Sequence, residues 1–134
     1  SLLPADLTAR AWVRGFALAI ACDIHPMQNL RVGKYLMHDL SISDAQKKQW
    51  VCHWVQLGFN ALETQLANNP HSGDFCYGAF PTFADVCLVP QVYSAKRFEV
   101  PLEAYPRILR VYEACLKLQA FIDARPEAQV DYEA

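Results

Sequence analysis

Nearly every position between residues 83 and 93 is apolar, so a helix formed there would have no polar face to turn towards water. Thr82 and Asp85 stand three residues apart at the start of this run. That is the spacing of a capping box, in which the hydroxyl and the carboxylate each satisfy a free backbone N–H at the helix end. The pattern predicts a helix that begins after Thr82. Because a helix that is apolar all round is normally enclosed, we expect the rest of the chain to surround it.

The spacing of apolar residues predicts further helices on both sides of that run. These cover residues 7–24, about 28–40, 44–67 and 106–116, and residues 118–124 either continue the last of them or form a short final helix. Pro26 should stop or kink the first helix, because proline lacks an N–H and disfavours the α conformation at His25. No alternating strand pattern occurs, so the predicted fold class is all-α, a bundle of about five to six helices.

Composition narrows the class of protein. With 134 residues, 53% of them hydrophobic and 19% charged, the chain is expected to form one globular domain. A net charge of −2 argues against a nucleic-acid surface. The most apolar stretch is interrupted by Arg14 and Asp23, which makes it too short to span a bilayer, and no signal peptide precedes Leu2. We therefore expect no membrane association and a cytoplasmic location.

The five cysteines are widely spaced and odd in number. No Cys-x-x-Cys pair occurs, which argues against a zinc site or a thioredoxin-type redox pair, so no metal is predicted. Four of the five fall within helical patterns, where buried thiols are common. Cysteines of this kind indicate that the protein is in a reducing compartment.

Six motifs, taken together, are far more specific than the capping box: Leu2-Leu3-Pro4, Asp23–Pro26, Gly58–Ala61, Thr82–Val92, Ala95–Phe98 and Ala104–Pro106. With them the chain resembles the zeta-class glutathione transferases, which include maleylacetoacetate isomerase and the bacterial maleylpyruvate isomerases. The resemblance implies that residues 1–134 form the C-terminal helical domain of such an enzyme. The chain starts at the Leu-Leu-Pro linker, so the N-terminal thioredoxin-like domain is expected to be absent from it.

The resemblance implies a role for Arg97 in binding a carboxylate of a maleyl substrate. Without the resemblance, Arg97 would be read as a surface cation favoured by the end of a helix. A planar guanidinium matches a carboxylate with two hydrogen bonds in a way that lysine does not, which agrees with the implied role.

The resemblance also implies that the segment around Pro26 contacts glutathione. His25 and Asn29 occupy matching positions; without the resemblance His25 would be a polar cap at a helix end. Leu30 stands where some bacterial members have an arginine, so part of the anion site is either missing or supplied by Arg31. No residue of this chain is expected to be catalytic, because the serine that activates the thiol belongs to the absent domain.

The function implied is a glutathione-dependent cis–trans isomerase of maleyl compounds. In such an enzyme the glutathione thiolate adds to the cis double bond, the new single bond rotates, and elimination gives the fumaryl product. The expected partners are glutathione, the small maleyl substrate, the thioredoxin-like domain and a second copy of the enzyme. Two alternatives stay open: a non-catalytic assembly domain, and a zeta-class transferase that acts on other small electrophiles.

Overall fold

The computed structural model describes residues 1–132, and within them every regular element is helical. The elements are α1 (Leu7–Leu18), the π-helix η1 (Ala19–Ile24), α2 (His25–Met27), α3 (Leu30–His38), α4 (Asp44–Asn68), α5 (Phe83–Arg97), α6 (Pro106–Cys115), α7 (Gln119–Asp123) and the 3₁₀-helix η2 (Pro126–Ala128). The all-α prediction is confirmed. The helices are more numerous than predicted because the first predicted helix is divided into α1 and η1 and is followed directly by the short α2, and because the C-terminal part contains further short helices.

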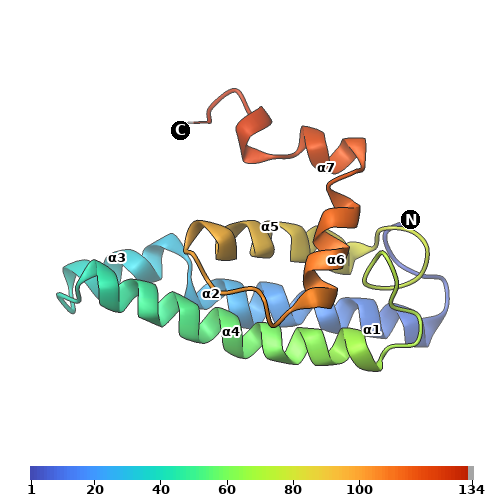
Figure 1. Ribbon diagram of the computed structural model, residues 1–134, viewed down its shortest axis with the longest axis horizontal. Coiled ribbons are helices and arrows are strands. Elements are labelled where there is room, and N and C mark those ends of the chain that lie inside the picture. Colours follow the sequence, from blue (N-terminus) through green and yellow to red (C-terminus); the bar gives the residue numbers. More distant parts are fainter. Residues whose placement is uncertain (133–134) are drawn as a thin grey trace.

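Figure 1 shows α1 and α4 running along the length of the molecule, with α5 lying over them. The helix α5 packs against α1, α6 and η1, and α4 packs against α6, η1 and α3. Large apolar side chains from all of the long helices meet without solvent exposure between these elements, among them Phe16, Phe59, Leu62, Leu88 and Ile108. The C-terminal segment with α7 and η2 stands away from this core on the far side of α5.

The expectation that α5 is enclosed on all sides is wrong for the described chain. One face, which includes Leu88, Val92 and Ala95, is fully buried. The opposite face is partly open, with Phe83 and Val86 each 39% exposed. The reason is that α1, α6 and η1 cover only one side of α5, so apolar periodicity alone overstated how completely it is covered.

Pro26 does not end the first helix, which continues to Met27. Before Pro26 the helix widens into the π-form over η1, and the His25 N–H bonds to the Ile20 carbonyl five residues earlier. Pro26 follows in the last turn of this continuous path and, having no N–H, donates no helical hydrogen bond to the preceding turn. The break comes at Gln28, and Asn29 caps α3 by accepting a hydrogen bond from the Arg31 N–H at 3.1 Å.

The capping box predicted at the start of α5 is present, and its carboxylate is completely buried. Asp85 Oδ2 accepts hydrogen bonds from the backbone N–H of Thr82 at 2.7 Å and from its hydroxyl at 2.8 Å. Asp85 Oδ1 accepts a further one from the Cys76 N–H at 2.8 Å. The same side chain therefore begins α5 and ties down the loop that precedes it.

The start of α6 is capped from another helix. Glu63 of α4 accepts hydrogen bonds from the backbone N–H groups of Arg107 and Ile108, both at 3.0 Å, and an ion pair with the Arg107 guanidinium adds to them. These are two of the free donors at a helix N-terminus. Glu63 thus supplies the cap that Tyr105, the residue at the N-cap position, does not provide.

We expect Asp85→Ala to lower the free energy of unfolding by about 2–4 kcal/mol, because it leaves the buried N–H of Cys76 and both donors of Thr82 without an acceptor. Asp6→Ala is the matched control, since Asp6 caps α1 through one hydrogen bond at an exposed position, and it should cost only about 1 kcal/mol. Urea denaturation measures both. Equal losses in the two variants would contradict the anchoring role of Asp85.

Candidate functional site

The four residues predicted to contact glutathione lie together at the break between η1 and α3, which we call the corner segment (residues 25–31). His25 begins α2, and Asn29, Leu30 and Arg31 form the start of α3. His25 and Arg31 are exposed, and Leu30 is 70% exposed. The Oδ1 atom of Asn29 is engaged in the cap, which leaves its amide NH₂ to donate outward. The corner segment therefore presents polar donors at the surface.

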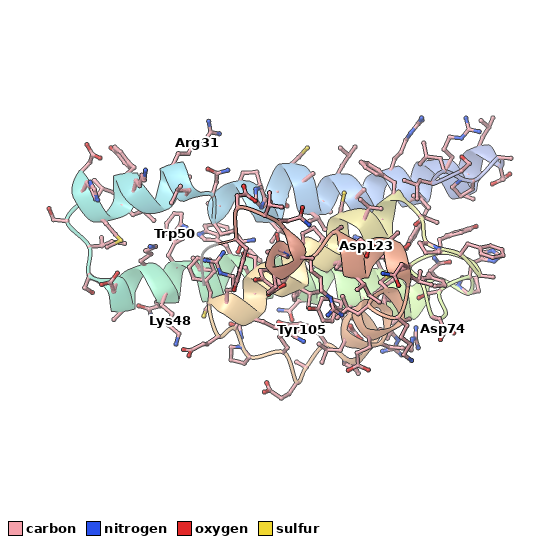
Figure 2. All side chains as sticks on the ribbon, turned by 90° about the horizontal axis from the view of Figure 1, so that it is seen from above. Arg31, Lys48, Trp50, Asp74, Tyr105 and Asp123 are labelled. Atoms are coloured by element: carbon pink, nitrogen blue, oxygen red, sulfur yellow. The ribbon has the colours of Figure 1, made fainter. Side chains whose placement is uncertain are left out.

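Two side chains from neighbouring helices hold the corner segment in place. The indole N–H of Trp50, on α4, donates to the Met27 carbonyl at 2.7 Å. The amide of Gln28 donates to Gln91 Oε1, on α5, at 2.7 Å. Figure 2 shows Trp50 between α4 and α3, whereas Arg31 points outward from α3, away from α5.

Gly58, on α4, allows η1 to pack closely against that helix. A Cβ atom built on Gly58 would overlap with Cγ1 and Cδ1 of Ile24, a side chain that is only 3% exposed. Ile24 directly precedes His25, so the absence of a side chain at Gly58 sets how close the corner segment lies to α4. This explains a glycine within a helix, where it otherwise costs stability.

Arg97 is the last residue of α5, exposed, and without a salt bridge inside residues 1–132. It follows Ser94 by three positions and Tyr93 by four, so these residues are its neighbours on the helix surface. Ser94 lies within 3.4 Å of the Gln28 amide oxygen. Arg97 thus lies one turn beyond the residue of α5 that contacts the corner segment, whereas Arg31 points away from α5 (Figure 2).

A mainly apolar groove of about 450 Å³ lies along the open face of α5. Its other wall is the C-terminal segment, and the lining comprises Val86, Val89, Pro90, Tyr93, Tyr112, Leu116, Phe121, Ala124, Arg125, Pro126 and Glu127. The Tyr93 hydroxyl donates to Glu127 Oε1 at 2.8 Å across the groove, and this hydrogen bond is the main cause that raises the pKa of Tyr93. The positive charge of Arg97, four residues later on the same helix, acts on that pKa in the opposite direction.

Other kinds of site find no support in the described residues. Between residues 1 and 132 no group of three or more acidic, histidine or cysteine side chains could hold a metal ion. In the same part of the chain, no helix combines the length and apolar character needed to cross a membrane. All five cysteines are free, and burial, followed by the charge of Asp85, raises the pKa of the Cys115 thiol to about 12.

Sequence reasoning missed Gln28 and Gln91. Neither belongs to a recognisable chemical pattern, and their 63-residue separation hides the contact. The one available signal was Gln91 itself, a polar residue within an otherwise apolar helix.

Comparison with known proteins gives relatives over almost the whole chain, although no family model matches it. Maleylpyruvate isomerase from Ralstonia sp. is 45% identical over 131 residues, which cover 98% of this chain and 62% of the relative. A holo structure of a zeta-class bacterial maleylpyruvate isomerase is 44% identical with a TM-score of 0.97, covering 99% of this chain and 63% of that one.

Two further solved structures extend the comparison. Maleylpyruvate isomerase from Pseudomonas aeruginosa is 42% identical with a TM-score of 0.94, covering 98% of this chain and 69% of that one. Maleylacetoacetate isomerase from Anaeromyxobacter dehalogenans was solved with dicarboxyethyl glutathione and citrate bound in its active site. It is 39% identical with a TM-score of 0.92, and the match covers 100% of this chain and 60% of that one. The chain thus spans about three fifths of the length of the curated relatives it matches.

We expect Gly58→Ala to destabilise the protein by about 1–2 kcal/mol, because the clash with Ile24 outweighs the gain in helix propensity. Gly15→Ala is the matched control. Gly15 also lies in a helix, but a Cβ there meets no atom within 4 Å, so this variant should gain about 0.5–1 kcal/mol. Thermal or urea denaturation compares the two, and a stabilised Gly58→Ala would show that the close approach is not required.

Proposed function

Because this chain belongs to the zeta-class glutathione transferases, the family of maleylacetoacetate and maleylpyruvate isomerases, we propose that it is the helical domain of a glutathione-dependent isomerase of maleyl compounds. In the complete protein, by which we mean this chain joined to a thioredoxin-like domain, the product is the fumaryl isomer. The observation that carries the proposal is the match to a solved maleylpyruvate isomerase over 99% of the chain, at 44% identity and a TM-score of 0.97.

That match favours the isomerase over the two alternatives considered from the sequence. An assembly domain needs the fold, but it has no need of an exposed arginine at the end of α5 beside a surface of polar donors. The similar structure with citrate and dicarboxyethyl glutathione in its active site also supports a substrate class with more than one carboxylate.

The donors of the corner segment fit glutathione, which carries two carboxylates and two peptide groups. His25 and the free NH₂ of Asn29 would hold it by hydrogen bonds, and Arg31 supplies a positive charge on the outer side of α3. Leu30 offers only an apolar contact there. Glutathione supplies the nucleophilic sulfur of the reaction. The residues of this chain bind and orient; none of them activates a thiol.

Arg97 is proposed to hold a carboxylate of the maleyl substrate. Arg97 ends α5 one turn after Ser94, which contacts Gln28 of the corner segment, and four residues after Tyr93, which lines the groove. A maleyl substrate bound at this end of α5 would meet a glutathione held by residues 25–31. Fixing the carboxylate there aligns the double bond and lowers the entropic cost of reaction. The cation also reduces the repulsion between the substrate anion and a nearby thiolate.

The groove along α5 is proposed as the place where the thioredoxin-like domain packs. It exposes apolar side chains that a closed domain would bury, and the relatives are longer than this chain by more than a third of their own length. We further propose a cytoplasmic homodimer. Five free cysteines, of which Cys22 is exposed, suit a reducing compartment. Exposed Tyr35 on α3 and Leu57 on α4 offer apolar surface to a second copy.

The purified 134-residue chain is expected to show no isomerisation of a maleyl substrate in the presence of glutathione. The physical reason is that it contains no group that stabilises the thiolate. Conversion of maleylpyruvate to fumarylpyruvate, followed by absorbance, is the measurement, with the complete protein as positive control. Turnover by the chain alone would contradict the division of roles.

Arg97 variants of the complete protein test the substrate contact. Arg97→Lys keeps the charge but loses the paired geometry, and Arg97→Ala loses both, so kcat/KM for the maleyl substrate should fall in that order. For the alanine variant the loss should be on the order of tenfold to several hundredfold. Affinity for glutathione should hardly change. Weaker glutathione binding with intact maleyl turnover would show that the two roles are exchanged, and full activity would make Arg97 a surface cation only.

Val86→Asp tests the packing of the two domains. In the complete protein it should lower the free energy of unfolding by roughly 1–3 kcal/mol, because it would bury a charge in an apolar interface. In the isolated chain Val86 is 39% exposed, and the effect should be small. Val130→Asp, at a fully exposed position outside the groove, is the control. An equal effect of Val86→Asp in both proteins would argue against docking at the groove.

A further inference from the structure

Gln91 is a buried polar residue that the proposed function does not use. It lies in the middle of α5, directly after Pro90, and is only 3% exposed. Its Oε1 accepts the hydrogen bond from Gln28, but its Nε2 has no hydrogen-bond partner within residues 1–132. A buried donor without a partner lowers stability, and folded proteins contain few of them. Packing alone therefore does not explain a glutamine here, because an apolar side chain of similar volume would stabilise the core more.

The partner of Gln91 sits at the point where the helical path breaks. Gln28 has the non-helical torsion angles φ −115° and ψ 7° and closes a turn by donating its N–H to the His25 carbonyl at 3.2 Å. It stands between Met27, whose carbonyl is held by Trp50, and Asn29, which caps α3. The corner segment is thus held from α4 by an indole and from α5 by an amide.

These two contacts act on different parts of the corner segment. The indole of Trp50 fixes the backbone at Met27, while the amide of Gln91 fixes the direction in which the Gln28 side chain leaves the turn. Asn29, the next residue in the chain, caps α3, so the Gln28 side chain leaves the backbone one residue before the start of that helix. Neither Gln28 nor Gln91 needs to touch a ligand to do this.

We propose that Gln91 is a positioning residue for glutathione: through Gln28 it orients the corner segment that carries His25 and Asn29. The inference rests on the proposed function and adds to it a residue on α5 that determines glutathione affinity. This role also accounts for the unpaired Nε2 of Gln91. The corner segment requires the acceptor Oε1, and a glutamine side chain that supplies this oxygen also carries the NH₂ group.

Gln91→Met in the complete protein tests the inference. Methionine keeps the length and approximate volume of the side chain but removes both the acceptor and the unpaired donor. We expect KM for glutathione to rise about three- to tenfold, the effect of one lost neutral hydrogen bond. At saturating glutathione, kcat should stay within about twofold, and the thermal midpoint should be unchanged or higher.

A double-mutant cycle separates positioning from general damage. Gln28→Met also removes the 3.4 Å contact with the Ser94 hydroxyl, so it should raise KM for glutathione by at least the factor of Gln91→Met. The double variant should match Gln28→Met, because the hydrogen bond between the two glutamines can be lost only once. Gln119→Met is the matched control. Gln119 also donates its amide to a neighbour, Asp123 at 2.7 Å, but at an exposed site on α7, and its variant should leave KM unchanged.

The outcomes distinguish this inference from the function on which it rests. Additive effects of the two substitutions, an unchanged KM in both single variants, or a parallel fall of kcat and thermal midpoint would each overturn the positioning role while leaving the isomerase assignment intact. A wild-type protein whose activity does not depend on glutathione would overturn the proposed function and, with it, this inference.

Discussion

A fully buried carboxylate, Asp85, is the interaction on which the rest of the structure depends. A charge without solvent contact is tolerated only where its oxygens are satisfied by hydrogen bonds, and here the donors are Cys76, Thr82 and the positive end of α5 itself. Because α5 contacts α1, α6 and η1, fixing its start orients the whole bundle. Burial, and next the negative charge of Asp85, also raises the pKa of Cys76, which keeps that thiol protonated.

The other end of α5 is where the candidate chemistry gathers. Gln91 holds the corner segment through Gln28, Ser94 lies near the same amide, and Arg97 ends the helix one turn later. One helix therefore joins a structural anchor at its first turn to the proposed binding residues at its last turn. Pro90 lies between the two ends, and its exposed side faces the groove. This arrangement explains why a helix with so little polar surface contains both Asp85 and Gln91.

Incomplete coverage of α5 connects the fold with the proposed function. An isolated domain would gain stability by closing the apolar groove. Instead, the C-terminal segment with α7 and η2 lies away from the core, and the hydrogen bond between Tyr93 and Glu127 connects it to α5. Surface of this kind is retained where another domain or molecule covers it. The proposed glutathione contacts His25 and Arg31 are likewise exposed at the surface of the bundle.

The sequence alone determined the helical class and the start of α5 at Thr82 and Asp85, because capping and periodicity involve residues within one or two turns of each other. The motifs also pointed to the family. Only the tertiary structure decided the rest. The passage of the helix through Pro26 depends on the π-form of η1. The cap of α6 comes from Glu63, some 44 residues earlier in the chain. The contact between Gln28 and Gln91 spans 63 residues. Such contacts leave no periodic trace in the sequence, because they are set by how whole helices pack and not by the residues beside them.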